Sequence, residues 1–364
     1  MKPSRLQLRL EHGIRNALST FEADCLRAER AGYLARIGQF DEVRVELAAL
    51  HERYDSRPNV EMSAWLNLID GLVIFSREMG HAASDKIRRA HALSRAAGLV
   101  RLRPLSAAWL AHMDFLNADV DAMAVHLCEA LSLADQSHFS ALARAHLVVA
   151  QGYHQGGRLD LALPWYFSAR DNAILEGDDA AVSALMHNMA WLRASNLRQE
   201  QLLGTKSAGE NDHALLSAQS IANYDLLVGV VSLHAHVPIL RAKLLTLNGQ
   251  PAEALLLFDE YLRTAVSEGL GRLQADLVAD RAWCRLQVGQ LNEARKDAAF
   301  AQSMIDPMGH FDDRAFAHSR LVEVFSALGE SNAVACHQKL ADTAWREYIE
   351  FQSRIVYSLN MIKT

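Results

Sequence analysis

Histidine is the residue type in this chain with the clearest capacity for chemistry, because it can bind metals and transfer protons near neutral pH. The sequence contains 16 histidines, and two of them, His234 and His236, lie together in the segment LHAHVP. Residues two positions apart on a helix point in different directions, so these side chains could not share a metal ion without an irregular backbone. The surroundings of His112 and His187 offer no better ligand spacing, and no HExxH pattern occurs. We therefore expect no metal site.

Cysteine and the acidic residues form no catalytic arrangement either. Cys284 follows Trp283 in the middle of a predicted helix, where packing is favoured over a nucleophilic role. Acidic pairs such as Asp312–Asp313 fall near predicted helix ends, where they stabilise a helix dipole or face solvent. The chain has no GxSxG elbow and no GxxxxGK(S/T) loop. The sequence therefore predicts a protein that is not an enzyme and uses no cofactor.

The composition of the 364 residues indicates helix nearly throughout, since Ala, Leu, Arg and Glu are frequent and Pro occurs only 7 times. A net charge of −6 without a dense Lys/Arg block disfavours a nucleic-acid partner. The charged N-terminus lacks the apolar core of a secretion signal, and the apolar run at 226–233 is too short to span a bilayer. We expect a cytoplasmic protein with no membrane partner and four reduced thiols, at Cys25, Cys128, Cys284 and Cys336.

The elements that would position any functional side chain are indicated by a recurring phrase, apolar-x-x-x-Gly-x-apolar-x-x-small. It occurs as LARIGQFDEV (34–43), YHQGGRLDLA (153–162), LTLNGQPAEA (245–254), RLQVGQLNEA (285–294, with Arg first) and, more loosely, FSALGESNAV (325–334). Gly249, Gly289 and Gly329 are separated by steps of 40 residues. A repeat of this length is typical of a helical solenoid, in which each unit is a hairpin that turns at the glycine.

The spacing of the small, large and glycine positions resembles the motif of the tetratricopeptide repeat (TPR) family. The first unit supplies Ala31, Leu34, Gly38, Phe40 and Val43, and the seventh supplies Ala282, Arg285, Gly289, Leu291 and Ala294. The repeat is about 40 residues rather than the usual 34, and so is similar to the long kinesin-light-chain type and to sensor arrays of some bacterial regulators. The resemblance implies an all-α, right-handed α–α superhelix of about eight hairpins.

The other units are less regular, and we assign their turns to Gly80, Ala118 and Leu197. The step from Leu197 to Gly249 is 52 residues, which predicts an insertion in the polar stretch 204–212. We therefore expect a single solenoid over 1–364. Its approximate units are 20–58, 59–98, 99–138, 139–178, 179–230, 231–270, 271–310 and 311–350, with 351–364 as the end of a capping helix.

The TPR resemblance also implies which side chains line the concave groove, because the first helix of each TPR hairpin faces it. Transferred by position, these residues are Arg36, Arg77, His112, Gln151, His154, His187, Trp191, Lys243 and Trp283. Such a mixture suits a peptide, with Trp and Arg as anchors, although the tryptophans could equally fill the core between repeats. No Lys/Asn set of the carboxylate-clamp type is evident.

The last helix, within 338–364, carries a row of large apolar residues: Leu340, Trp345, Tyr348, Phe351, Ile355 and Leu359. We expect it to cap the solenoid, with a homodimer through this helix as the alternative. Residues 1–26 are expected to form an opening helix without a helix-turn-helix signal. The function that follows is a scaffold that binds a peptide or extended partner segment in its groove. The alternative is a ligand- or peptide-sensing module that controls a separate output protein.

Overall fold

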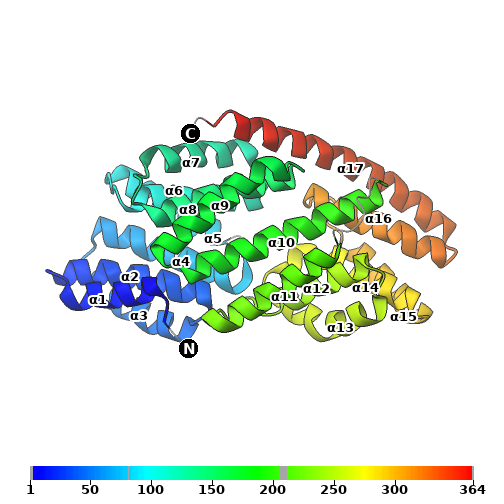
Figure 1. Ribbon diagram of the computed structural model, residues 1–364, viewed down its shortest axis with the longest axis horizontal. Helices are drawn as coiled ribbons and strands as arrows, with labels where there is room; N and C mark the ends of the chain where they lie inside the picture. The colour runs from blue at the N-terminus through cyan, green and yellow to red at the C-terminus, as the bar shows by residue number, and fades with distance from the viewer. Residues whose placement is uncertain (1–2, 81, 205–210, 363–364) are drawn as a thin grey trace.

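The computed structural model describes residues 3–80, 82–204 and 211–362, and all regular structure within these ranges is helical. The helices follow one another as a coiled array (Figure 1). They are α1 (Arg5–Asn16), α2 (Thr20–Ile37), α3 (Phe40–Tyr54), α4 (Val60–Glu78), α5 (Ala82–Ala96), α6 (Leu102–Leu116), α7 (Val120–Leu133), α8 (Phe139–Gln155), α9 (Leu159–Glu176), α10 (Asp179–Leu202), α11 (Asn211–Val228), α12 (His236–Leu247), α13 (Pro251–Ser267), the 3₁₀ helix η1 (Leu270–Leu273), α14 (Gln274–Gln287), α15 (Leu291–Met304), α16 (Phe311–Ala327) and α17 (Ser331–Asn360).

From α2 onward, the helices described here pair into eight hairpins, each even-numbered helix with the odd-numbered helix that follows it. The array is a right-handed α–α superhelix, as the sequence predicts. Small residues allow the two helices of a hairpin to approach closely. In α15, for example, Ala294, Ala298 and Ala301 are all 0% exposed.

The recurring glycines end the first helix of their hairpins. Gly38, Gly157, Gly249, Gly289 and Gly329 have φ values of 70–87°, a left-handed conformation that only glycine adopts without strain. Ala118 occupies the corresponding turn with φ of 56°, and Gly80 lies between α4 and α5. These seven turns are therefore where the sequence predicts them.

The turn predicted at Leu197 is wrong. Leu197 is 5% exposed within α10, which continues to Leu202 because its sequence holds no glycine or proline. The first left-handed residue after it is Gly204, with φ of 70°. The predicted insertion at 204–212 falls mostly on residues 205–210, which lie outside the described residues.

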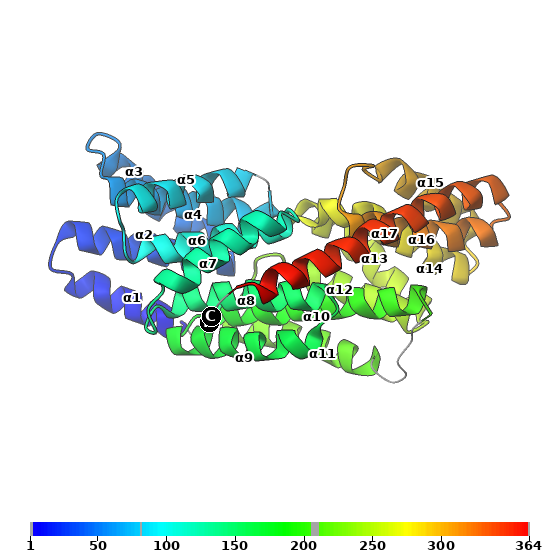
Figure 2. The same ribbon diagram turned by 90° about the horizontal axis from the view of Figure 1, so that it is seen from above.

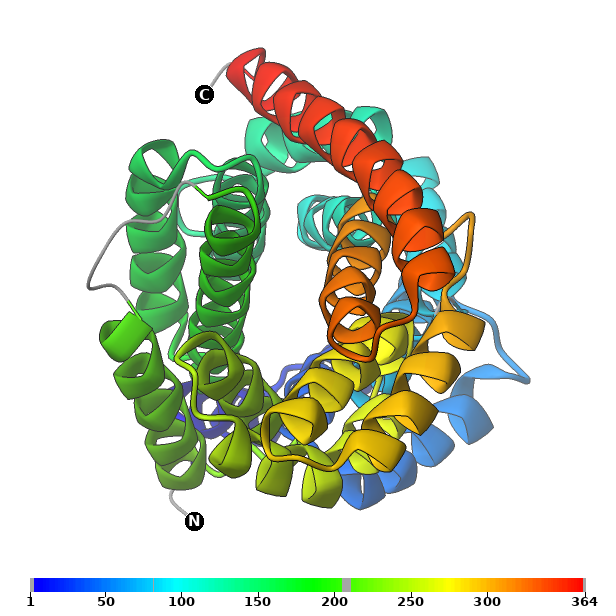
Figure 3. The same cartoon turned by 90° about the vertical axis from the view of Figure 1, so that its right-hand side faces the viewer.

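The superhelix completes a turn, so that segments distant in sequence meet. The amide of Val231 donates to the carbonyl of Ile37 at 3.0 Å, which links the loop before α12 to the end of α2. Similarly, the amide of Leu6 in α1 donates to the carbonyl of Gly177, between α9 and α10, at 3.1 Å. Viewed along the long axis, the helices surround the centre as a ring (Figure 3).

Helix α17 is the second helix of the last hairpin, and it also reaches back to the middle of the array. It crosses from α16 to α7 and α8 (Figure 2). Tyr153 of α8 donates its hydroxyl to Asn360 at 2.9 Å, and Gln352 donates to the carbonyl of Gln155 at 2.7 Å. The large apolar residues that prompted the homodimer alternative are thus mostly buried within the chain, apart from Leu340. A homodimer remains a prediction that would have to use exposed residues of α17, which include Leu340, Ile349 and Tyr357.

Candidate binding cavity

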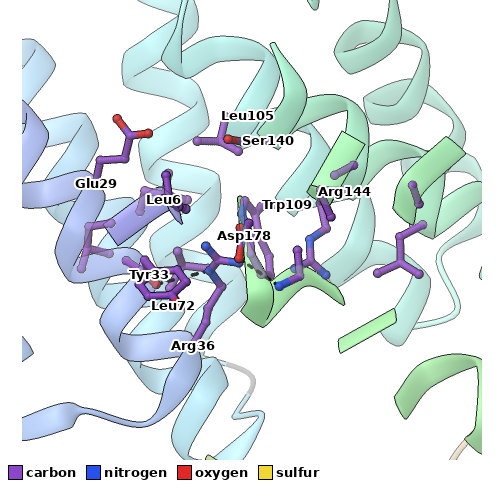
Figure 4. A pocket seen from close by; sticks show the side chains of 18 of the residues that line it. Leu6, Glu29, Tyr33, Arg36, Leu72, Leu105, Trp109, Ser140, Arg144 and Asp178 are labelled. Carbon is purple, nitrogen blue, oxygen red and sulfur yellow. Dashed lines mark hydrogen bonds and ion pairs between the residues drawn. The ribbon is translucent and has the colours of Figure 1, made fainter. Parts of the chain in front are cut away.

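The first helices of the N-terminal hairpins, together with α1 and α9, enclose a cavity (Figure 4). We call it the inner cavity. It measures about 670 Å³ including its open mouth, but only about 60 Å³ of this is accessible to the centre of a water molecule. A space of this size admits one small chemical group of a ligand rather than a whole peptide. Its lining is Leu6, Glu29, Gly32, Tyr33, Arg36, Trp65, Leu68, Ile69, Leu72, Leu105, Trp109, Ser140, Ala143, Arg144, Leu147, Ala169, Ala173, Asp178, Ala181 and Leu185.

Arg144 of α8 is the most unusual member of this lining. It is 6% exposed, and its Cζ lies 3.7 Å from the centre of the Trp109 ring, a cation–π contact. Its Nη1 donates to His112 Nδ1 at 2.9 Å, since a guanidinium can only donate. Among the described residues no carboxylate forms an ion pair with it. Burial, and then the nearby charge of Arg36, lower the pKa of Arg144 to about 9, so the side chain stays charged at neutral pH.

Arg36 of α2 enters the inner cavity from a different element and, unlike Arg144, is neutralised. Its Nη1 lies 2.8 Å from Asp178 Oδ2, at the start of α10. Asp178 also caps α10, because its Oδ1 accepts from the amide of Ala181 at 2.9 Å. Figure 4 shows Arg36, Asp178, Trp109 and Arg144 converging on the same space. The carboxylate of Asp178 is therefore already committed to two partners.

Aromatic rings hold Arg144 in place. His112 stacks on Trp109 with ring centres 5.9 Å apart, and Phe75 packs edge-on against both rings. Burial, followed by the charge of Arg144, keeps the pKa of His112 well below its usual value. His112 is therefore neutral and accepts a hydrogen bond without competing with Arg144 for an anion.

A second, more open hollow adjoins the inner cavity, and about 430 Å³ of it is accessible to the centre of a water molecule, compared with about 60 Å³ in the inner cavity. We call it the outer hollow. Four residues line both spaces: Glu29, Trp65, Leu105 and Ser140. The remaining wall includes the loop before α8, at Asp135, Ser137 and His138. The two spaces together could hold a ligand whose end enters the inner cavity.

Of the nine residues predicted to face a groove, the structure brings only two to the inner cavity. Arg36 lines it, and His112 supports Arg144 from behind. Gln151 and His154 are buried in α8, where His154 Nδ1 lies 3.1 Å from the Tyr166 hydroxyl and burial lowers the pKa of His154 to about 4. His154 therefore lies inside the α8–α9 hairpin rather than facing a groove.

Lys243, another predicted groove residue, belongs instead to a buried cluster of charges in the C-terminal half, and the predicted Trp191 and Trp283 lie against cations of that cluster. Lys243 Nζ lies 2.6 Å from Asp276, and the ammonium sits above the Trp191 ring at 5.7 Å. The Cζ atom of Arg320 lies above the Trp283 ring, 5.0 Å from its centre. We call the buried ions the charge network: Arg198, Lys243, Asp276, Asp280 and Arg320.

The last two predicted groove residues lie elsewhere. Arg77 is exposed and stacks over Phe40 of α3 at 4.7 Å, and His187 Nε2 lies 2.7 Å from Asp225 of α11. Neither lines the inner cavity.

Reasoning by position in the repeat missed Arg144 and Trp109. Arg144 lies 13 residues before Gly157, further from its turn than any residue that was assigned to the groove. A signal was nevertheless present. Arg144 is the only Lys, Arg, Asp or Glu in the 17 residues of α8, which are otherwise mostly apolar. A mostly apolar helix of this length is expected to be largely buried, and a charge buried with it needs a partner.

Within the described residues, no group of three or more His, Cys, Asp and Glu side chains could hold a metal ion. Over the same residues, no helix combines the length and the apolar character that crossing a membrane would require.

Comparison with known proteins gives a likeness in structure only. No protein-family model matches the chain, and no curated protein matches it in sequence. A crystal structure of a Rap protein complexed with competence and sporulation factor is similar over 95% of this chain and 92% of that chain, with a TM-score of 0.55 and 12% identity. The apo form of RapI covers 94% of this chain and 91% of its own, with a TM-score of 0.47 and 11% identity. The first likeness shows that the helical-repeat fold is shared.

Proposed function

We propose that this chain is a scaffold that binds a short peptide, or a short extended segment of a partner protein, at the inner cavity and outer hollow. The observation that carries the proposal is Arg144, a buried charge that forms no ion pair with any carboxylate of the described residues and lies beside a space that opens to the surface. A charge is costly to bury, so its retention at a cavity favours a ligand that supplies the missing partner.

Two further features support a peptide as the ligand. The outer hollow, larger than the inner cavity, offers both apolar and polar side chains, such as Trp65, Leu105 and Ser140, as contacts for an extended segment. The Rap protein that shares this fold was crystallised with a bound factor, competence and sporulation factor, so a helical array of this kind can hold a ligand.

The proposal is tested by incubating the full chain with pools of random pentapeptides and identifying retained peptides by mass spectrometry. The matched variants are Ser140→Phe, which blocks the junction of the two spaces, and Ser132→Phe, which adds the same ring to an exposed site on α7. We expect retention by the wild-type chain and by Ser132→Phe, and its loss in Ser140→Phe. Equal retention by both variants would place binding elsewhere.

The second candidate, a sensing module that controls a separate protein, is favoured by the position of α8. One end of this helix lines the inner cavity through Ser140 and Arg144, and its other end supports α17 at Gly152 and Gly156. A ligand that moves α8 would therefore shift the position of α17. The surface that α17 presents to another protein would change with it.

We further propose that the chain is one continuous solenoid of the long-repeat TPR type and that it acts in the cytoplasm by binding alone. The 40-residue steps between the left-handed turns at Gly249, Gly289 and Gly329 support the long repeat.

A further inference from the structure

The inner cavity contains a positive charge, that of Arg144, which no carboxylate pairs with in residues 3–80, 82–204 and 211–362. Arg144 is more than nine-tenths buried, yet its only polar side-chain partner in the described part of the chain is the neutral ring of His112. Its contact with Trp109 lowers the cost of burial but does not replace an anion. By contrast, the buried Arg198 and Arg320 both pair with carboxylates.

The acidic residues nearest the inner cavity are occupied. Asp178 holds Arg36 at 2.8 Å and caps α10. Glu29, at the mouth, lies 2.8 Å from Arg101. Neither carboxylate can turn to Arg144 without abandoning a charged partner.

We infer, building on the proposed peptide-binding function, that Arg144 binds a carboxylate of the ligand, with the flat face of Trp109 behind it and the rest of the ligand in the outer hollow. A guanidinium offers two parallel N–H donors that match the two oxygens of a carboxylate. The inner cavity accommodates a group of that size, with about 60 Å³ accessible to the centre of a water molecule.

Several observations converge on this assignment. Arg36 stands on the same cavity and adds positive charge, partly offset by Asp178. Burial and then the charge of Arg36 lower the pKa of Arg144 to about 9, although the charge of Asp178 acts in the opposite direction, so the surroundings destabilise the charged guanidinium. A bound carboxylate would reverse this effect, because an opposite charge at close range stabilises the protonated guanidinium.

The carboxylate can come from the C-terminus of a peptide or from an Asp or Glu side chain, and four pentapeptide pools separate these sources. Two pools end in a free carboxylate and two in an amide, and within each type one pool contains Asp and Glu while the other lacks them. We expect binding from the pool that has both sources of carboxylate and none from the pool that has neither. The two mixed pools then identify the source.

Variants test the residue itself. Arg144→Gln keeps a hydrogen-bond donor without the charge, and Arg144→Lys keeps the charge without the paired donors. The control is Arg88→Gln, at an exposed position of α5. For a peptide selected by the wild-type chain, we expect affinity roughly ten- to hundredfold weaker in Arg144→Gln, an intermediate value in Arg144→Lys and no change in Arg88→Gln. The thermal midpoint of ligand-free Arg144→Gln should not fall, because the substitution removes an uncompensated buried charge.

The outcomes distinguish this inference from the proposed function. Equally tight binding from the pool that has no carboxylate would overturn the inference while leaving peptide binding intact. If no pool binds, the proposed function fails, and N-acetylglycine is then compared with its amide by thermal shift. Stabilisation by N-acetylglycine in the wild-type chain but not in Arg144→Gln would support the carboxylate site, and no difference would overturn it.

Discussion

Arg198 shows how a single buried residue can join two distant parts of this array. It lies on α10 and is 1% exposed, with its guanidinium against Asp276 and Asp280 of α14. Burial alone would raise the pKa of Asp276, but the charges of Arg198 and Lys243 outweigh it and lower the pKa. Both partners of these ion pairs are therefore charged at neutral pH, and each depends on the other for solvation.

Replacing Arg198 by Met should cost about 3–5 kcal/mol in the free energy of unfolding, because it leaves two carboxylates buried with fewer cations. Urea unfolding monitored by circular dichroism measures this change. Arg88→Met, which removes an exposed ion pair with Asp85, is the control and should have little effect. A loss below about 1 kcal/mol for Arg198→Met would mean that water or other cations compensate the carboxylates.

Residue types in the sequence indicate which side chains carry charge but not which charges meet. Lys243 was expected to bind a partner, yet its ammonium is used by Asp276, 33 positions later in the chain. The repeat period predicts which side chains of a hairpin point toward the interior of the array. It does not predict whether an inward-facing cation meets a carboxylate of the same chain or an open cavity, as Arg144 does.

At the scale of single elements, the hairpin turns are the best-predicted feature. The five recurring glycines all adopt a left-handed conformation at the end of a helix. This conformation depends on the residue at that one position, so a short sequence motif is enough to predict it. The fifth turn was misplaced because α10 runs for 24 residues without a breaking residue. The repeat spacing alone therefore placed the turn at Leu197. In the structure Leu197 is buried inside α10, and the helix continues past it to Leu202.

Helix α17 lies against α8 through two glycines that leave room for its side chains. A Cβ atom at Gly152 would come within 2.7 Å of Leu359 Cδ1, and one at Gly156 would overlap Cγ2 of Val356. Neither glycine has a positive φ, so close packing rather than backbone conformation favours glycine here.

Gly156→Ala should therefore strain the contact between α8 and α17 and reduce stability by about 1–3 kcal/mol. Valine is stiff and cannot move its methyl group away easily. Adding Val356→Ala removes the obstructing methyl, so the double variant should lose less stability than the sum of the single variants. Urea unfolding of all three proteins measures this coupling.

The control for this prediction is Gly271→Ala in η1, where the nearest atom to an added Cβ is 3.8 Å away. Strictly additive effects of Gly156→Ala and Val356→Ala would show that the two residues do not meet as described.

Across the whole molecule, the array coils around its long axis (Figure 3), and segments far apart in the sequence contact one another. The end of α2 meets the loop before α12, and α17 meets α7 and α8. These contacts depend on the angle between successive hairpins, and small differences in that angle accumulate over several repeats. The sequence period predicts a solenoid, but the contacts between distant hairpins cannot be predicted from the sequence of any single repeat.

The contacts between distant hairpins have an energetic consequence. In an open solenoid each repeat contacts only its neighbours, so stability is close to a sum of local terms and the ends can fray. Here α17, the last helix, is fixed by Gln352 to the carbonyl of Gln155 and by Asn360 to Tyr153. Opening of α17 must therefore disturb α8, and anything that holds α8 should restrain α17.

A ligand in the inner cavity should consequently slow amide hydrogen exchange in α17 as well as in the helices that touch it. Arg144 and Ser140 place one end of α8 at the ligand, while Gly152 and Gly156 place the other end against α17. Exchange measured by mass spectrometry on the full chain, with and without a selected peptide, tests this coupling. Gly156→Ala should weaken the effect in α17 while retaining it in α6 and α8. Slower exchange confined to the cavity helices of the wild-type chain would show that α8 does not transmit binding, which would favour a simple scaffold over a sensing module.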